Sequence, residues 1–398
     1  MKAVCFFLTV LWMLNIGPHE RVYAKDLADL EHYIGEKDAV LVMDDRGKIL
    51  FTKNAQKKLI PASTLKILTS LVSLYYLGED YRFTTEFYLD QNENLVVKGY
   101  GDPLLVSEAL QEIADVIQTK LRKFNDLILD DSYFKHPITI PGVSSSFEPY
   151  DAPNGALCVN FNTIYFKKDD SGRYESAESQ TPLLPAVFDR IKKSRLKSGR
   201  IVLSAEKRGF LMYAGHLMLY FLKEKGIASN GLVRIGRVSK GKDTLIFKYR
   251  SRFSLKEIII RLLDYSNNFM ANQIMIGAGT KIYGPPGTLE KGVRLVSNYA
   301  RQILKMNDIH IVEGSGISRN NRISADNLDK ILEAFEPYHN LMPREDRTFL
   351  KTGTLNGIRT MAGYIVHEHE RLYRFTLLFN TPGKTTRPVL DRILKAID

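Results

Sequence analysis

Apolar and polar positions alternate in blocks along the first part of the chain, and these blocks predict a hairpin followed by a helix. Apolar runs at 40–43 and 49–51 flank a polar turn that contains Gly47, which is typical of two strands joined by a tight turn. Over residues 63–77 the apolar positions recur with the spacing of one helix face, and Gly78 follows as a stop signal. We therefore expect strand, turn, strand and helix in that order.

The second half of the chain returns to helical periodicity and closes with strands. Apolar residues have helical spacing in three segments, at 255–263, 289–306 and 325–335. Two apolar strands follow at 361–366 and 373–378, and a short helix at 388–397 ends the chain. Strands near both ends with helices between them predict one discontinuous α/β domain, in which the first hairpin pairs with the last strands.

The middle of the chain has a different pattern, which indicates an insertion. From about residue 83 to 247 it carries short β-branched runs, several Gly and Pro residues and a basic stretch at 192–200. We expect this part to be mainly β with a few helices. The predicted division is a domain formed by 25–78 and 250–398, interrupted by an inserted region of one or two smaller lobes at 79–249.

The N-terminus has the features of a secretory signal peptide. Lys2 precedes an apolar run at 3–16, and a polar stretch leads to small-residue position Ala24, so we expect residues 1–24 to be removed. The run is shorter than the ~20 apolar residues of a membrane-spanning helix. A retained anchor is the competing interpretation. We predict an exported protein, periplasmic or elsewhere in the cell envelope, with at most peripheral membrane contact.

Composition and charge narrow the class of protein and its partners. The chain has 398 residues, 44% hydrophobic and 25% charged, which is typical of a globular protein. Its formal net charge of +11 suits work beside anionic envelope polymers. Export and the lack of any run of five like charges argue against a nucleic-acid partner. Beyond the signal, Cys158 is the only cysteine, so it forms no internal disulfide and is expected to be buried.

A Ser-x-x-Lys pattern occurs five times, but only its first occurrence, at Ser63 and Lys66, opens an apolar helix. There the spacing of three residues places the hydroxyl and the amine on one face of the helix, one turn apart. The unpaired N–H groups of a helix N-terminus also favour developing negative charge. The alternative is that Ser63 is an ordinary N-cap and Lys66 a solvated side chain.

Two further polar motifs follow in a fixed order. Ser266, Asn267 and Asn268 lie directly between two apolar helices, which predicts a tight turn. The tripeptide 351–353 reads Lys-Thr-Gly, continues with Thr354 and falls just before the last strand pair. Each of these two motifs also has a purely structural interpretation. For Ser266 it is a helix cap, and for the Lys-Thr-Gly tripeptide it is a strand start with a polar turn. Separately these motifs are weak signals, but the Ser63/Lys66 pattern and the two later motifs, together and in this order, are a strong one.

This set resembles the active-site motifs of penicillin-binding proteins and class A β-lactamases. Four segments, at 61–66, 99–105, 129–134 and 313–319, resemble the class C low-molecular-mass penicillin-binding proteins, which are D-alanyl-D-alanine carboxypeptidase/endopeptidases. Their hallmark is a large insertion between the first two motifs, and here Lys66 and Ser266 are 200 positions apart. The chain departs from the family at Asn267, where Asp is usual, and in lacking a Gly-x-Asp-Gly stretch before Lys351.

The resemblance implies an α/β (α+β) penicillin-binding/β-lactamase-like transpeptidase fold, with an antiparallel sheet flanked by helices and a large, mainly β insertion. It implies a serine D-Ala-D-Ala carboxypeptidase and/or DD-endopeptidase that acts on peptidoglycan stem peptides. The reaction would pass through an acyl-enzyme on Ser63, and β-lactam antibiotics would inhibit it. Neither a cofactor nor a metal ion is implied.

The resemblance also assigns roles to individual side chains. Ser63 would be the nucleophile, Lys66 its base and Ser266 the group that passes the proton to the leaving amine. Burial and a second cation nearby would lower the pKa of Lys66. The substrate-binding residues would be Asn268, Lys351, Thr352, Gly353 and Thr354. Within this set Asn268 would hold the substrate amide, and Lys351 with the two threonines would bind the terminal carboxylate. The N–H groups of Ser63 and Thr354 would form the oxyanion hole.

Two other functions are compatible with the motifs. A serine β-lactamase would need a Glu that activates water, and Glu336 with Asn340 matches that pattern, but Pro337 interrupts it and the insertion has no place in that class. A non-catalytic peptidoglycan-binding scaffold would explain the altered Asn267 and the shortened segment before Lys351. The intact polar residues of the three motifs argue against it.

Overall fold

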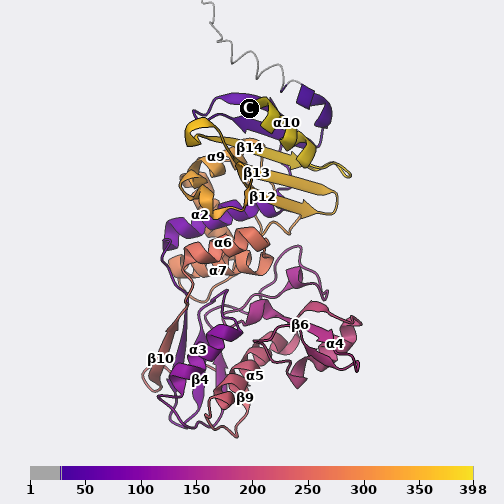
Figure 1. The fold of residues 1–398 in the computed structure, drawn as a ribbon. Coiled ribbons are helices and arrows are strands. Elements are labelled where there is room, and N and C mark those ends of the chain that lie inside the picture. The colour runs from indigo at the N-terminus through magenta and orange to yellow at the C-terminus, as the bar shows by residue number, and fades with distance from the viewer. Residues whose placement is uncertain (1–26, 28, 398) are drawn as a thin grey trace, which may run out of the picture.

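The computed structural model describes Leu27 and residues 29–397, so the predicted signal peptide at 1–24 lies outside the described residues. Two parts of the molecule are evident in Figure 1, one built around a long sheet and the other holding the middle of the chain. None of the helices in the described residues is long and apolar enough to cross a bilayer.

The central sheet joins the two ends of the chain, as predicted. It has six antiparallel strands in the order β11-β12-β13-β14-β1-β2. Val40 of β1 pairs with Leu377 of β14, so the first hairpin continues the last strands. The strands are β1 (Asp38–Met43), β2 (Ile49–Lys53), β11 (Arg344–Glu345), β12 (Thr348–Leu355), β13 (Ile358–Val366) and β14 (Leu372–Phe379).

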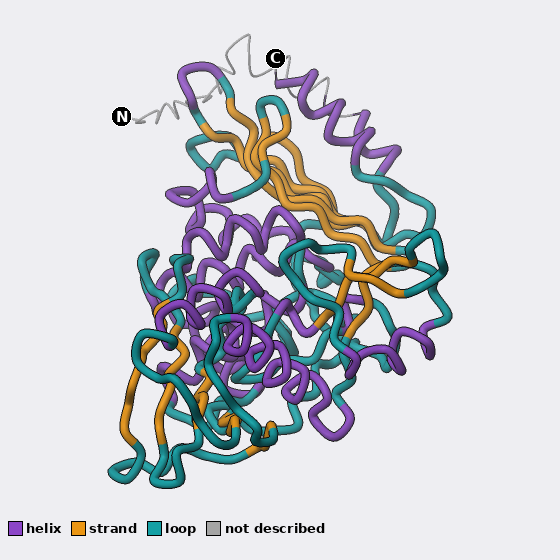
Figure 2. Tube along the Cα trace, turned by 60° about the horizontal axis from the view of Figure 1, so that its bottom comes forward, coloured by secondary structure: helices purple, strands orange, loops and turns teal. Residues whose placement is uncertain are grey.

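Helices cover both faces of this sheet because its strands are apolar on both sides (Figures 1 and 2). Alternate residues of a strand point to opposite faces. Val40 therefore packs in the cluster that contains Ile393 of α10, whereas Leu41 packs with Leu68 of α2. The helices on and below the second face are α2 (Leu65–Leu77), α6 (Leu255–Tyr265), α7 (Asn268–Tyr283), α8 (Leu289–Gln302) and α9 (Ala325–Phe335), and α10 (Arg387–Ile397) covers the first face.

Several predicted boundaries need correction. The Lys-Thr-Gly motif lies within its own strand, β12, where the sequence predicts only a segment before the last strand pair. Polar and glycine residues at 351–354 hide the strand pattern, but pairing with β13 along its whole length stabilises it. The last two strands are longer than predicted, and α8 ends at Gln302 rather than 306. Ser63 lies in a 3-10 turn (Ala62–Thr64) that precedes α2.

The inserted region contains two further sheets (Figure 1). The five-stranded sheet has the order β10-β3-β4-β5-β9 and mixes antiparallel with parallel pairs. Its strands are β3 (Thr84–Leu89), β4 (Leu95–Gly99), β5 (Leu127–Asp130), β9 (Val233–Ile235) and β10 (Thr244–Arg250). The three-stranded sheet has the order β7-β6-β8. The other elements are α3 (Ser107–Ile117), α4 (Phe188–Ser194), α5 (Gly209–Glu224), β6 (Thr163–Lys168), β7 (Tyr174–Ser176) and β8 (Gly199–Val202).

Candidate active site

Close backbone packing holds the turn that carries Ser63. Ala62 has a φ of 47°, a left-handed conformation that is unusual for a residue other than glycine. A Cβ on Gly316 would lie 1.8 Å from the carbonyl oxygen of Ala62, and a Cβ on Gly353 would lie 2.8 Å from the Ser63 nitrogen. The hydroxyl of Thr360 donates a hydrogen bond of 2.7 Å to the carbonyl of Pro61. The turn is therefore fixed between a loop and the sheet at positions where only glycine fits.

Lys66 lies directly beneath Ser63 and is completely buried. Its Nζ is 2.9 Å from Ser63 Oγ, 2.8 Å from Asn268 Oδ1 and 2.7 Å from the carbonyl oxygen of Ser315. The last two atoms can only accept hydrogen bonds, whereas the serine hydroxyl can also donate one. A neutral amine that donates to both acceptors directs its lone pair at Ser63 Oγ.

The surroundings of Lys66 also favour the neutral amine. Complete burial and, secondarily, the positive charge of Lys351 lower the pKa of Lys66 to about 7, against an opposing effect of Glu313. Desolvation disfavours a charged amine because the interior solvates it poorly, and a nearby like charge adds to this. Near neutral pH a substantial fraction of Lys66 is therefore unprotonated.

The second motif forms the predicted turn between α6 and α7. Ser266 follows the last residue of α6 and has a φ of 52°. Asn267 is the N-cap of α7, and its Oδ1 accepts a hydrogen bond of 2.9 Å from the Met270 nitrogen. Asn and Asp are about equally good at this position, so the departure at Asn267 conserves a helix cap. The next residue, Asn268, then places its side chain against Lys66.

Residues of the third motif alternate along β12 between positions that face the cavity and positions that are buried. Thr352 and Thr354 line the same cavity as Ser63, Ser266 and Asn268. Lys351 and Gly353 are buried and are not among the residues that line it. Burial lowers the pKa of Lys351 to about 8, with Asp264 opposing. Lys351 thus contributes charge to the site from behind its surface.

A buried carboxylate, to which no sequence motif assigns a role, organises the loop behind Lys66. Glu313 is fully buried and accepts hydrogen bonds from the Ser315 nitrogen at 2.7 Å, the Gly316 nitrogen at 2.7 Å and Asn272 Nδ2 at 3.1 Å. These bonds fix the Ser315 carbonyl against Lys66. The sequence signal that points to this loop is the resemblance of segment 313–319 to the family.

The inserted region supplies the opposite wall of the cavity, which has a volume of about 840 Å³. Tyr150 and Asp151 line it, and Ser144 Oγ donates a hydrogen bond of 2.5 Å to Asp151 Oδ2. The sequence gives no sign of this wall because it is irregular backbone positioned by distant contacts. The cavity therefore joins side chains from both parts of the molecule.

The residues that match a deacylating Glu pattern do not reach this cavity. Glu336 begins the 3-10 helix Glu336–Leu341, and its Oε2 lies 4.0 Å from Arg374 Nη1. Neither Glu336 nor Asn340 is among the residues that line the cavity around Ser63.

A sequence model of the D-Ala-D-Ala carboxypeptidase 3 (S13) family matches residues 22–200 and 203–343, which is most of the chain. The protein belongs to this family. The match includes the first two motifs and ends before Lys351. The structure itself brings the third motif to the site, because Thr352 and Thr354 line the same cavity as Ser63.

Named relatives and solved structures agree with this assignment. The chain is 26% identical over 350 residues to the D-alanyl-D-alanine carboxypeptidase of Actinomadura sp., a match that covers 75% of this chain and 64% of that protein. The chain thus spans less than two thirds of that relative.

The crystal structure of penicillin-binding protein 4 from Haemophilus influenzae is similar in fold, with a TM-score of 0.74, 19% identity and coverage of 92% and 97% of the two chains. A penicillin G-acylated predatory endopeptidase of Bdellovibrio bacteriovorus gives a TM-score of 0.50 at 16% identity, covering 90% and 88%. These likenesses support the penicillin-binding fold.

Proposed function

We propose that this chain is a serine D-Ala-D-Ala carboxypeptidase and/or DD-endopeptidase that acts on peptidoglycan stem peptides and is inhibited by β-lactams. The observation that carries the proposal is the set of three contacts around Lys66 Nζ, which directs the lone pair of the neutral amine at Ser63 Oγ. A serine hydroxyl is a weak nucleophile that needs such a base. Family membership and the name of the Actinomadura relative support the substrate class.

In the proposed reaction, Ser63 Oγ bonds to the carbonyl carbon of the penultimate D-Ala while its proton moves to Lys66. Ser266, which lines the same cavity, gives its proton to the leaving nitrogen and takes up the one held by Lys66, and the C–N bond breaks to give an acyl-enzyme with neutral Lys66 and Ser266. Water then attacks the ester, and the proton transfers run in reverse to release Ser63. The backbone N–H groups of Ser63 and Thr354 stabilise the oxyanion.

Substrate binding is assigned to the surface of the same cavity. Asn268 holds the peptide amide while its Oδ1 positions Lys66. The terminal carboxylate lies against Thr352 and Thr354, which line the cavity, and the buried charge of Lys351 attracts it from behind. Gly353 allows β12 to approach the Ser63 nitrogen closely, which keeps this binding surface beside the nucleophile. A β-lactam, which carries a carboxylate beside a strained amide, fits the same set of contacts.

We further propose that the protein is exported and works in the periplasm or elsewhere in the cell envelope. The signal-peptide pattern at 1–24 supports export. The peptidase unit is proposed to comprise 25–78 and 250–398, with 79–249 inserted, because strands from both ends share one sheet. Glu336 is not among the residues that line the cavity, which makes the β-lactamase alternative less favourable.

The test is intact-mass spectrometry after brief incubation with benzylpenicillin, with Ser63→Ala as the control. A persistent single adduct on the wild type that is absent from the variant supports the peptidase, because its acyl-enzyme breaks down slowly. Rapid hydrolysis of the drug without a lasting adduct would indicate a β-lactamase. Folded protein that neither binds nor hydrolyses the drug would indicate the non-catalytic scaffold. Release of D-Ala from a synthetic pentapeptide then establishes the carboxypeptidase reaction.

A further inference from the structure

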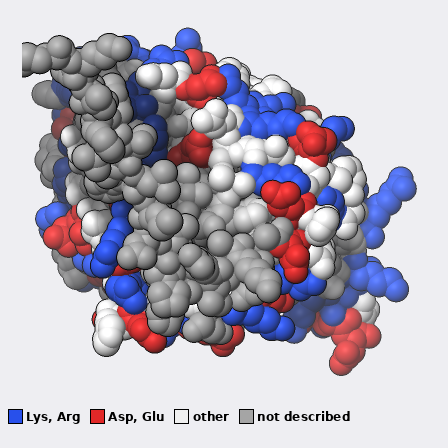
Figure 3. Space-filling model, turned by 90° about the horizontal axis from the view of Figure 1, so that it is seen from above, with Lys and Arg blue, Asp and Glu red and all other residues white. Residues whose placement is uncertain are grey.

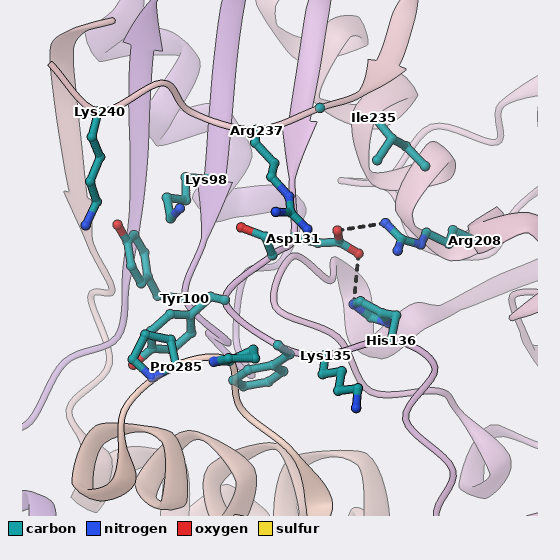
Figure 4. A pocket seen from close by; sticks show the side chains of 15 residues that line it. Lys98, Tyr100, Asp131, Lys135, His136, Arg208, Ile235, Arg237, Lys240 and Pro285 are labelled. Atoms are coloured by element: carbon teal, nitrogen blue, oxygen red, sulfur yellow. Dashed lines mark hydrogen bonds and ion pairs between the residues drawn. The ribbon is translucent and has the colours of Figure 1, made fainter. Parts of the chain in front are cut away.

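A second cavity, of about 760 Å³, lies in the inserted region at the end of α7 that is remote from the candidate active site (Figure 4). Residues at the ends of β4, β5 and β9 line it, together with Pro285 and Pro286, which follow α7. Asn268 begins α7 and Tyr283 ends it. At 1.5 Å per residue the helix is ~24 Å long, so the two cavities are about one helix length apart. The proposed reaction uses no residue of this cavity.

Positive charge is concentrated in this second cavity. Among the residues that the structure describes, Asp131 is the one acidic residue in its lining, against five Lys and Arg side chains and one His. The basic residues are Lys98, Lys135, His136, Arg208, Arg237 and Lys240. On the face seen from the α10 end, by contrast, the described residues place basic side chains beside acidic ones (Figure 3). The cavity is therefore a local site of unbalanced positive charge.

Two buried carboxylates hold part of this charge in place. Asp131, with 4% of its side chain exposed, lies 3.0 Å from Arg208 Nη1 and 2.8 Å from His136 Nε2, as Figure 4 shows. Asp130 is fully buried, and its Oδ2 accepts hydrogen bonds from Lys98 Nζ at 2.9 Å and from the Val238 nitrogen at 3.0 Å. Fixed cations lose little freedom when they bind an anion, which favours binding.

Two other cations of the cavity have no partner among the described residues. Arg237 and Lys240 are exposed and make neither a hydrogen bond nor an ion pair with any part of the chain that the structure describes. Figure 4 shows them extending from the connection between β9 and β10, Arg237 toward Asp131 and Lys240 toward Tyr100. They are the groups available to an incoming anion.

Aromatic rings form another part of the wall. The rings of Tyr100 and Tyr133 meet edge to face with centroids 4.9 Å apart, and Tyr100 is anchored through a 2.6 Å hydrogen bond from its hydroxyl to Glu86. The backbone carbonyl of Tyr133 accepts a 2.7 Å hydrogen bond from the Gly287 nitrogen, which ties the wall to the connection between α7 and α8. Rigid aromatic faces beside a few charged groups are typical of a binding site for an organic ligand rather than for a bare ion.

We propose that this cavity binds carboxylate-bearing parts of a peptidoglycan strand at a distance from the scissile stem peptide, and so holds the polymer at a second point. The proposal rests on the proposed function. The Arg guanidinium matches a carboxylate in charge and shape. A polymer can span the separation between the two cavities, and binding at one raises its effective concentration at the other. The segments 99–105 and 129–134, which the catalytic site does not use, contribute to this cavity.

The test compares two double charge reversals that change the net charge equally. Arg237→Glu/Lys240→Glu alters the cavity, and Lys192→Glu/Lys193→Glu alters an exposed part of α4. Each protein is first acylated with benzylpenicillin to occupy the candidate active site, and its sedimentation with purified, teichoic-acid-free sacculi is measured at physiological ionic strength. We expect the cavity variant to bind about tenfold more weakly and the α4 variant to bind as the wild type does.

Two further readouts make the result decisive. The rate of acylation by benzylpenicillin and the release of D-Ala from a short soluble peptide are expected to be equal in all three proteins, which shows that the variants fold. Unchanged sedimentation of the cavity variant, or an equal loss in the α4 variant, would overturn the proposal. Stronger competition by a glycerol phosphate oligomer than by a disaccharide tetrapeptide would assign the cavity to a phosphate polymer instead. If benzylpenicillin does not acylate the wild type, the proposed function is contradicted but the cavity proposal is not. Sedimentation without the drug then still tests whether the cavity binds peptidoglycan.

Discussion

Lys66 Nζ and Asn268 Oδ1 lie 2.8 Å apart although 202 positions separate them in the chain. The contact joins the first turn of α2 to the first residue of α7, so the proposed base and the proposed substrate-binding amide hold each other in place. Because Asn268 Oδ1 can only accept, it occupies one N–H of the amine and leaves the lone pair for Ser63.

The pH dependence of acylation follows from the two buried lysines. The pKa of Lys66 is lowered to about 7 and that of Lys351 to about 8. The proposed base Lys66 accepts a proton only when it is neutral, so we expect the rate to rise with pH through about 7. We expect it to fall above about 8, as Lys351 loses the charge that is proposed to attract the substrate carboxylate. We expect a narrow bell in kcat/KM. In Lys351→Arg the falling limb is expected to disappear because Arg stays charged. A falling limb that persists in this variant would contradict the assignment of that limb to Lys351.

Glu313 is expected to be a positioning residue that acts through Lys66. Its charge opposes the lowering of the Lys66 pKa, so Glu313→Gln should move the rising limb of the pH profile to lower pH. Weaker support for the Ser315 carbonyl should also slow acylation about tenfold.

A merely structural role would slow acylation without moving the midpoint of the profile. The measurement is the rate of benzylpenicillin acylation across pH, with thermal unfolding as the control for folding. A midpoint that stays fixed or shifts to higher pH would contradict the electrostatic role of Glu313.

Gly316→Ala should abolish acylation and lower the free energy of unfolding by at least about 2 kcal/mol. Gly316 has a φ of 84°, and the new Cβ would lie 1.8 Å from the Ala62 carbonyl oxygen, in the turn that carries Ser63. Gly241→Ala is the matched control, since Gly241 has a φ of 80° but its added Cβ would meet none of the described residues within 4 Å. Equal losses of stability in urea would show that backbone conformation, not the close approach, decides the effect.

Asn267 is expected to act only as a helix cap. Asn267→Asp should keep both stability and the acylation rate, because either side chain caps α7, whereas Asn267→Ala should cost about 1 kcal/mol of stability. Urea unfolding and acylation kinetics measure the two effects. A large rise in the acylation rate of Asn267→Asp at unchanged stability would instead show that the departure from the family motif affects the chemistry.

Local patterns in the sequence were sufficient for most elements and for the family. The spacing of apolar residues predicts α9 at 325–335 as the structure has it, and it places the end of α2 at Gly78. Burial of Cys158 is also confirmed. Local patterns missed β12, because its polar and glycine residues at 351–354 hide the strand pattern while pairing with β13 stabilises the strand.

The sequence by itself determined the order of the motifs and which side chains could react, because these depend on residue type and short-range spacing. Only the tertiary structure decided that Ser315 offers its carbonyl to Lys66, that Lys351 acts from behind the cavity surface and that Tyr150 and Asp151 form the opposite wall. These relationships arise from contacts between segments far apart in the chain. The same contacts remove Lys66 from water, and that loss of solvation, which no local pattern records, sets its pKa.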